Sequence, residues 1–587
     1  MLIMRVSRDP VTHSKLGRNS LKTIHPNPCA RQSQFQMTLA VVLALLVSPT
    51  ILATAGTDVI PARPTSELAE PARVPFEAEA TAGSHGDPVG SFLYGNFGKA
   101  QDVLQEAIEA HGGPDWVNGH VGYSIAYQGQ YLFQAHLNKP WAHLDHGLEG
   151  RILYAPTGPT LKSDVTLTLH RPIQQGCLLQ ADFGLSLDSG VQDPEELRDE
   201  ALATRWREER ELLPQEFLRQ ALENPGSLCF LGTHGSRDVL QYEAGNAGRR
   251  ALFLDSSTHL LQRVESFAHW DSKGDRLEWT EFSAYQPFDG IQIPMTVRSH
   301  RELETTQANQ FVALTNVVLG TASESDAATL PVELRERYPD FPRPRASFPG
   351  DAATALLPIH DLGQGVHLLD LEAVEGRSVL VEYADYIVVV ESGGTSQVAE
   401  QILASAGHYF PDKPVRYLAM SHHHRISASG IRPYVQRGIT LLATKGNVDY
   451  LRDLAARPYR LVPDAQQRSP MLPRIELVEG LKVIEDAQQR LELHEFGTST
   501  HTDEYVFFYL PKLQLGTVGD LLYMPENPDQ QPAAPRGVAL YQLIGDLKLD
   551  IRHLVQTWPL EPNYAWIPIE TLERQVQLAI ERDHNGK

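Results

Sequence analysis

The sequence predicts an α+β protein in which a mainly antiparallel β domain precedes a domain of mixed strands and helices. Between residues 95 and 320, stretches such as 123–127 and 165–169 carry apolar residues at every second position, which is typical of strands with one face on a core. Beyond residue 356, short apolar runs alternate with helix-forming segments. At 587 residues the chain is also long enough for two domains with separate cores.

The composition agrees with a globular protein, since hydrophobic residues make up 42% of the chain and charged residues 21%. The formal net charge of −22 argues against general nucleic-acid binding, because contacts with phosphates need clustered lysines and arginines. We therefore expect no nucleic-acid partner.

Residues 1–55 are expected to be a secretory signal peptide. A basic segment precedes the apolar run Leu39–Val47, and Ala53 and Ala55 offer a cleavage site with small residues. This pattern predicts export to the periplasm or the medium, with no stable membrane span after cleavage. An uncleaved anchor is the alternative, although this run is short for a bilayer span of about 20 residues. A start at Met37 would remove the basic residues.

Cleavage of that segment would leave two cysteines, Cys177 and Cys229. In an oxidising compartment they can pair or stay apart, and the sequence leaves both possibilities open. Residues 56–94 are rich in Pro, Ala and Glu without periodicity, which predicts a tether.

The β domain, residues 95–320, is expected to begin with a helix that ends at Gly112 and Gly113. Strands should follow, with hairpin turns at residues 255–258 and 289–290. A charged helical insertion is expected at residues 195–222.

The hairpin segments FLDSSTHLLQRVES and FSAYQPFDGIQIP, preceded by a helix, resemble the β half-barrel of periplasmic lipoprotein carriers. The resemblance is one of pattern, without a diagnostic motif. It implies a concave apolar face, which either holds a lipid-like ligand or packs as an ordinary core. Packing is the commoner use of such a face.

A second composition shift, rich in Pro and charged residues, marks residues 321–355 as a linker. The remaining residues, 356–587, alternate strands and helices, so functional loops are expected at strand ends. One apolar strand, VRYLAM, leads directly into three consecutive histidines, His422 to His424.

This strand and the segment SHHHRISASG resemble the metallo-β-lactamase superfamily, whose members carry T-H-x-H-x-D-H-x-x-G after a strand. His422 and His424 match the first two histidines, and Gly430 matches the glycine. Ile426 stands at the position of the aspartate, and Ser427 at that of the next histidine.

The resemblance continues downstream and covers residues 357–575. In the segment GTSTHTDEYVFFYLPKLQLGTVGDLLY, His501 matches the third metal histidine and Asp520 the bridging carboxylate. Trp558 occupies the position of a late histidine. The resemblance implies a C-terminal αββα sandwich with its site along one edge.

In the family, three histidines hold one metal ion, and their counterparts His422, His424 and His501 are all present. The resemblance therefore implies one Zn²⁺, with Asp520 as a fourth ligand or as the residue that orients a water molecule. The second metal site keeps only Asp520 and is expected to be absent. The implied function is an exported mononuclear zinc hydrolase that cleaves an ester, thioester or amide.

The alternative is a pseudoenzyme whose metal site is degenerate, in which the β domain binds an apolar ligand or partner. Ile426 supports this alternative, because its side chain cannot accept a hydrogen bond or act as a base. The complete histidine trio supports the hydrolase. Either function implies a small-molecule or lipid-like substrate.

Overall fold

The computed structural model describes residues 92–585 apart from several gaps: 135–138, 141–142, 169–171, 189–194, 246–247, 302–307, 321–355, 500, 523, 525–527 and 560–565. The predicted signal peptide, nearly all of the predicted tether and the predicted linker lie outside the described residues. Among the described helices, none combines the length and the apolar character needed to cross a membrane.

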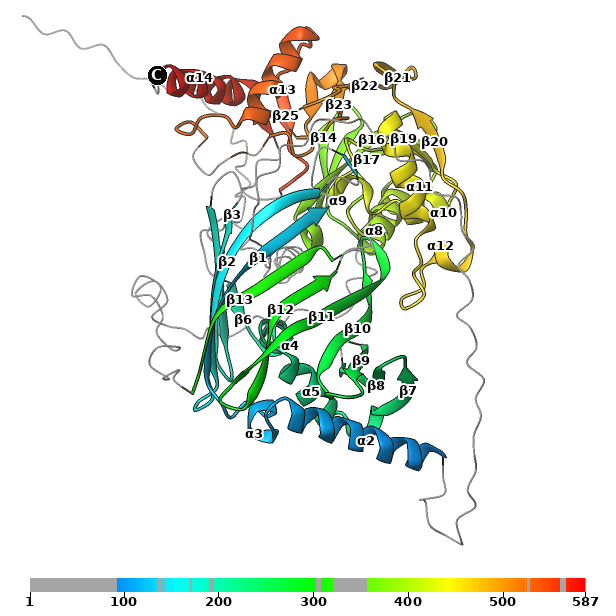
Figure 1. Cartoon of the computed structure of the whole chain (residues 1–587). Helices are drawn as coiled ribbons and strands as arrows, with labels where there is room; N and C mark the ends of the chain where they lie inside the picture. Colours follow the sequence, from blue (N-terminus) through cyan, green and yellow to red (C-terminus); the bar gives the residue numbers. More distant parts are fainter. Residues whose placement is uncertain are drawn as a thin grey trace, which may run out of the picture.

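A single antiparallel sheet of thirteen strands forms the first part of the fold (Figure 1). Its strand order is β6-β5-β4-β3-β2-β1-β13-β12-β11-β10-β9-β8-β7. The first strand, β1, therefore pairs with the last strand, β13, in the middle of the sheet. The strands are β1 Tyr123–Gln134, β2 His143–Ala155, β3 Thr160–Thr168, β4 Pro172–Leu179, β5 Gly184–Asp188, β6 Glu195–Leu197, β7 Cys229–His234, β8 Arg237–Glu243, β9 Arg249–Asp255, β10 Leu261–Trp270, β11 Gly274–Phe288, β12 Ile291–His300 and β13 Gln310–Leu319.

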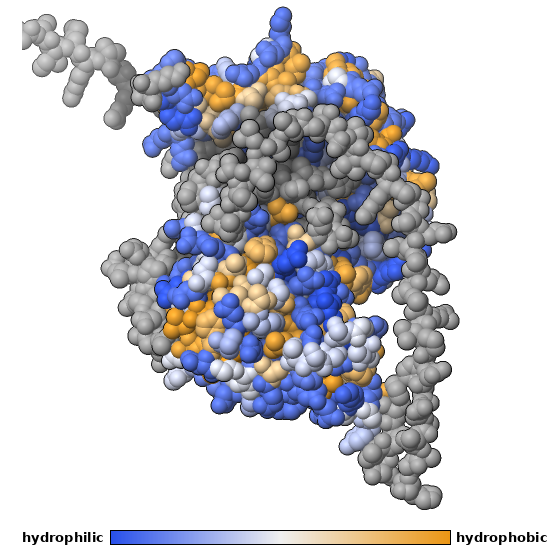
Figure 2. Space-filling model, in the orientation of Figure 1, coloured by the Kyte–Doolittle hydropathy of each residue, from blue (hydrophilic) through white to orange (hydrophobic). Residues whose placement is uncertain are grey.

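Helices cover one face of this sheet, which curves around them (Figure 1). They are α2 Phe92–Ala110, α3 Pro114–Val117, α4 Asp199–Arg210 and α5 Pro214–Glu223. Alternate residues of the strands meet the helices in one apolar core, because side chains of a strand alternate between its two faces. The apolar face of these strands is therefore packed against helices. Figure 2 shows further hydrophobic surface on the outside of this part. Phe311 and Val318 of β13 are among the exposed large hydrophobic side chains of this sheet.

The predicted first helix and both predicted hairpins are confirmed by α2 and by the pairs β9–β10 and β11–β12. Two boundaries differ from the predictions. Helix α2 begins at Phe92, inside the segment expected to be a tether. The charged insertion begins as a short strand, β6, because residues 195–197 pair with the edge strand β5 before the chain turns into α4.

The C-terminal part contains two further sheets. The first has the order β14-β15-β16-β17-β18-β19-β20 and the second β21-β22-β23-β24-β25-β26. The strands are β14 Ile359–Gly363, β15 Val366–Leu371, β16 Gly376–Glu382, β17 Ile387–Val390, β18 Val415–Ala419, β19 Thr440–Ala443, β20 Arg474–Leu477, β21 Leu481–Glu485, β22 Arg490–Glu495, β23 Val506–Leu510, β24 Leu515–Thr517, β25 His553–Val555 and β26 Ile567–Pro568.

Three apolar cores show how these sheets are layered. One core lies between the two sheets and takes side chains from both, for example Val379 and Phe508. A second core joins the outer face of the first sheet to helices, and a third joins the outer face of the second sheet to helices. The helices are α8 Ser396–Tyr409, α9 Arg425–Ala428, α10 Arg432–Gln436, α11 Val448–Ala456, α12 Ala465–Arg468, α13 Pro535–Asp546 and α14 Ile569–Asn585. The predicted αββα sandwich is confirmed.

The tip of the β10–β11 hairpin connects the first sheet to the sandwich. The Asp275 carboxylate accepts hydrogen bonds from the backbone N–H groups of Arg460 and Leu461, the latter at 3.0 Å. The ring of His269 meets Tyr459 edge-on, with centroids 4.9 Å apart. Gly274 has no room for a side chain, because an added Cβ would lie 2.6 Å from the carbonyl oxygen of Pro458. The two parts are therefore fitted closely at this point.

Candidate metal centre

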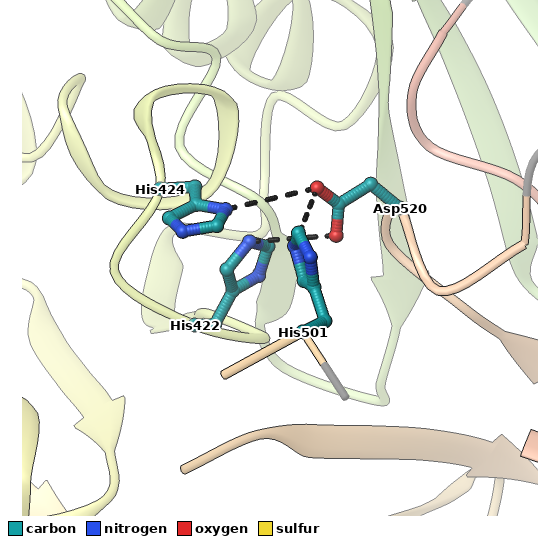
Figure 3. A group of neighbouring side chains, drawn as sticks. All are labelled: His422, His424, His501 and Asp520. Carbon is teal, nitrogen blue, oxygen red and sulfur yellow. Dashed lines mark ion pairs between the residues drawn. The ribbon is translucent and has the colours of Figure 1, made fainter. Parts of the chain in front are cut away.

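Four side chains from loops at strand ends converge at one edge of the sandwich (Figure 3). His422 and His424 follow β18 of one sheet, while His501 lies between β22 and β23 and Asp520 follows β24 of the other. One ligand atom from each lies within 4.8 Å of the others. The structure thus brings together all four site residues that the sequence analysis singled out.

The distances around the Asp520 carboxylate suit a shared metal ion. Its oxygens lie 3.4 Å from His422 Nε2, 3.8 Å from His424 Nδ1 and 2.9 Å from His501 Nε2. Two ligands held at about 2.1 Å in a tetrahedron are about 3.4 Å apart. Three imidazoles and one carboxylate are also ligands that zinc accepts. The ligand types and the distances to Asp520 are therefore compatible with a bound zinc ion.

Burial sets the protonation of the cluster. Desolvation, assisted by the neighbouring charge of His422, lowers the pKa of His424 to about 4, so its imidazole is neutral at pH 7. Burial alone would raise the pKa of Asp520. The charge of His422 and hydrogen bonds from the three histidines instead hold that pKa well below the usual range. A neutral imidazole and an ionised carboxylate are the forms that bind metal.

Two serines and a tyrosine fix the ring of His422. Ser421 Oγ lies 2.8 Å from His422 Nδ1, and Ser427 Oγ lies 3.4 Å from the same atom. When Nδ1 donates to Ser421, Nε2 carries the lone pair that faces the cluster. Tyr505 covers the ring on one face, with an interplanar angle of 20°.

Tyr505 also holds the loop that carries Asp520. Its hydroxyl donates to the carbonyl oxygen of Val518 at 3.0 Å and accepts from the N–H of Asp520 at 3.2 Å. Gly519, with φ +55°, lies directly against this hydroxyl and leaves no space for a Cβ. Sequence reasoning missed Tyr505, whose only signal was its place four residues after His501 at the start of a strand.

Ile426 and Trp558, which stand at ligand positions of the motif that the sequence resembles, are apolar. Ile426 is buried in the core beneath α8 and α10, and Trp558 packs against the same core. A Cβ added at Gly376 would lie 2.6 Å from Ile426 Cδ1, so the isoleucine is tightly enclosed. Ser427 is occupied with Ser421, at 3.0 Å between hydroxyls. Neither Ile426 nor Trp558 therefore offers a ligand to a second ion.

Glu391, which the sequence analysis did not single out, lies fully buried beneath the histidine loop. The backbone N–H of Ser421 donates to its carboxylate at 3.3 Å. Burial raises the pKa of Glu391 to about 7. It supports the loop from below and is not part of the metal-binding group.

Other polar residues near the cluster have different contacts. The ring of His423 meets Tyr450 edge-on, at 6.0 Å between centroids. Thr502 Oγ1 donates to the carbonyl oxygen of Glu504, and Asp503 pairs with Lys139 of the first part at 3.4 Å. None of the three belongs to the metal-binding group of the described residues.

The two cysteines of the described residues, Cys177 and Cys229, are both free thiols. The structure therefore shows no disulfide between them.

No protein-family model matches this chain, and neither does any curated protein. Among solved structures, it is similar to a metallo-β-lactamase from Erythrobacter litoralis, with 20% identity, 38% of this chain and 96% of the other covered, and a TM-score of 0.29. A metallo-β-lactamase from Pontibacter korlensis is 16% identical, with 38% of this chain and 98% of the other covered and a TM-score of 0.29. A third, from Pseudomonas aeruginosa in its mono-zinc form, is 17% identical, with 39% of this chain and 97% of the other covered and a TM-score of 0.28.

Proposed function

We propose that the C-terminal sandwich, which has the metallo-β-lactamase fold, is a hydrolase domain that holds one zinc ion. The observation that carries this proposal is the convergence of His422, His424, His501 and Asp520 within 4.8 Å. Three of these side chains are almost fully buried, and His501 is the most exposed, at 10% of its side chain. A substrate would therefore approach from the side of His501.

His422 Nε2, His424 Nδ1 and His501 Nε2 would hold the ion, and Asp520 would lie beside the fourth position, which stays open to water. Zinc with such ligands and one open position lowers the pKa of a water molecule to about 7 and polarises a carbonyl group. An activated water of this kind attacks carbonyl carbons, so the proposed substrates are esters, thioesters and amides.

Asp520 is the acceptor available for orienting the water, since its carboxylate lies beside all three histidines. Ile426 cannot take a proton, and general-base assistance is typically worth about 10²- to 10⁴-fold in rate. We therefore expect turnover to depend on Asp520 and to be slow.

Metal content is the first test of this function. Elemental mass spectrometry of protein purified with zinc and without chelators should give about one zinc per chain. His422→Ala should lose it. His408→Ala, which changes an exposed histidine of α8, should keep it. Zinc that is absent from the unmodified protein, or retained equally by His422→Ala, would overturn the metal site.

Activity is tested separately, on a panel of chromogenic esters, thioesters and amides. We expect slow hydrolysis that His501→Ala abolishes and that His408→Ala leaves unchanged. A bound zinc without activity on the whole panel would instead favour a binding module with a retained metal.

We also propose that the protein acts outside the cytoplasm, on the basis of the basic segment, apolar run and small residues in positions 1–55. N-terminal sequencing of protein recovered from the periplasm or medium should find a start at or near Gly56. A protein that stays in the cytoplasm with its N-terminus intact would contradict this localisation.

A further inference from the structure

A cleft of about 830 Å³ lies on the first sheet, and none of the four residues of the histidine cluster lines it. Its walls come from α4, from the β8–β9 turn, from β10 and the start of β11, and from Leu461 of the sandwich. The volume is within the range of small-molecule sites, roughly 300 to 1,000 Å³. Five arginines and four glutamates line it.

The sheet register explains why this place is hollow. On strand β10, Ser266 lies between Arg250 of β9 and Glu278 of β11, and Ala268 is opposite Arg276 of β11. Residues two apart on a strand share a face, so these long charged side chains border a pair of small ones on one face of the sheet. The small side chains leave room between the two arginines.

Three arginines meet a single carboxylate at the α4 side of the cleft. Glu211 lies 2.6 Å from Arg250 Nη2, 3.5 Å from Arg301 Nη2 and 3.8 Å from Arg207 Nε. Although burial opposes ionisation, these guanidinium groups lower the pKa of Glu211, so it carries a full negative charge. One negative charge cannot balance three positive ones, which leaves this wall cationic.

Glu208 is the other acid on this wall. Burial raises its pKa to about 7, so it is only partly ionised at neutral pH. The remaining lining pairs, Arg249 with Glu243 and Arg276 with Glu278, balance each other one to one. The cationic excess therefore persists around Glu211.

Two of the lining guanidinium groups each keep one buried donor without a partner among the described residues. The Nε atoms of Arg250 and Arg276 are buried and have no hydrogen-bond partner within the described part of the chain. Both side chains are more than nine-tenths buried. The guanidinium of Arg276 lies 3.7 Å from the ring centroid of Trp270, which fixes its plane. Fixed, desolvated guanidinium groups bind oxyanions strongly, because their N–H donors form a fork.

We propose that this cleft binds a small organic anion through a carboxylate or phosphate group held by Arg250 and Arg276. The body of the ligand would lie over Ser266 and Ala268, where the sheet is hollow. Leu461 completes the cleft from the sandwich side, so the bound ligand would touch both parts of the chain. This site is separate from the proposed zinc site and does not depend on it.

Isothermal titration of the full protein with inorganic phosphate and with succinate tests the proposal. At least one probe should bind saturably with a stoichiometry near one. Arg276→Gln should weaken that binding about tenfold or more, because it removes a charge-assisted donor. Ser266→Leu should do the same by filling the hollow while keeping every charge. Binding of phosphate alone would identify a phosphorylated ligand, and binding of succinate alone a carboxylate.

Arg298→Gln is the matched control, because this arginine of β12 is exposed on the same sheet and does not line the cleft. It should change the affinity by less than about twofold, as surface charges contribute little. The proposal fails if neither probe binds the unmodified protein saturably, or if Arg276→Gln and Ser266→Leu both bind as well as it does. Zinc content measured on the same variants should stay unchanged, so failure here is distinguishable from failure of the metal site.

Discussion

The ring of Tyr505 stacks on the imidazole of His422, with centroids 4.7 Å apart. The two residues come from different sheets of the sandwich: His422 follows β18 and Tyr505 immediately precedes β23. Since the Tyr505 hydroxyl also holds the backbone of Asp520, one side chain positions ligands contributed by both sheets.

Tyr505→Phe should keep the stacked ring and lose the hydroxyl. Residues that orient metal ligands typically contribute about 10- to 100-fold to metal affinity, so we expect zinc to bind about tenfold more weakly. Competition with a chromogenic chelator measures this change. Tyr509→Phe is the control, since Tyr509 lies on β23 and its hydroxyl donates to the carbonyl oxygen of Asp550, which is not part of the cluster. Equal zinc affinity in all three proteins would show that Tyr505 does not position the ligands.

Ile426→Asp should destabilise the sandwich without creating a second metal site. The new carboxylate would lie in an apolar core, and an uncompensated buried charge costs about 3 kcal/mol or more. Thermal unfolding should show a clearly lower Tm, whereas Ile426→Val should cost only about 1 kcal/mol. Zinc content should stay at about one ion per chain. A second ion in the aspartate variant would contradict this account.

Gly274→Ala should weaken the junction between the first sheet and the sandwich. Its φ is +86°, and an added Cβ would approach the Pro458 carbonyl and the Tyr459 ring. Gly290→Ala separates the two effects, because Gly290 has φ +85° and nothing within 4 Å of an added Cβ. Both variants carry backbone strain of about 1 kcal/mol. Only Gly274→Ala should lower the Tm further and increase the rate of limited proteolysis. Identical behaviour of the two variants would exclude a tight junction.

His111 should make the first part of the fold sensitive to acid. Its Nδ1 donates to Ala107 O at 2.7 Å, and its Nε2 accepts from Leu261 N–H at 3.3 Å. Burial lowers the pKa of His111 to about 4. Below the unfolded pKa of about 6.5, only the unfolded chain gains the proton, so stability falls from pH 6.5 towards pH 4, by at most about 3 kcal/mol.

His111→Gln should therefore lower the Tm at pH 7.5 but lose less additional Tm on acidification to pH 5 than the unmodified protein. His120→Gln serves as the control, since His120 is 65% exposed, and it should keep the original pH dependence. If the curves of Tm against pH are parallel for His111→Gln and the unmodified protein, this histidine does not govern the acid sensitivity.

Local patterns made much of the fold predictable. Alternation of apolar residues identified β9 to β12, and a glycine pair marked the end of α2. The site residues were predictable from the resemblance, because His422 and His424 match the motif after a strand and His501 and Asp520 match its later positions, and the structure brings all four together.

The supporting contacts were not predictable, because they join residues far apart in the chain. Glu391 reaches Ser421 across 30 residues, and Arg250 reaches Glu211 across 39. Strand β6 was also missed, since three residues in a charged segment carry no periodicity and owe their extended form to pairing with β5. Such contacts depend on register and topology, which a single sequence does not reveal.

The apolar core around Ile426 and Trp558 would make a second metal ion hard to introduce by substitution. A ligand placed at one of these positions would put a polar group among apolar neighbours before any metal could hold it. Several positions, Ile426, Ser427 and Trp558, would have to change together. Each single substitution would pass through a less stable protein, so a second ion could not be gained one step at a time.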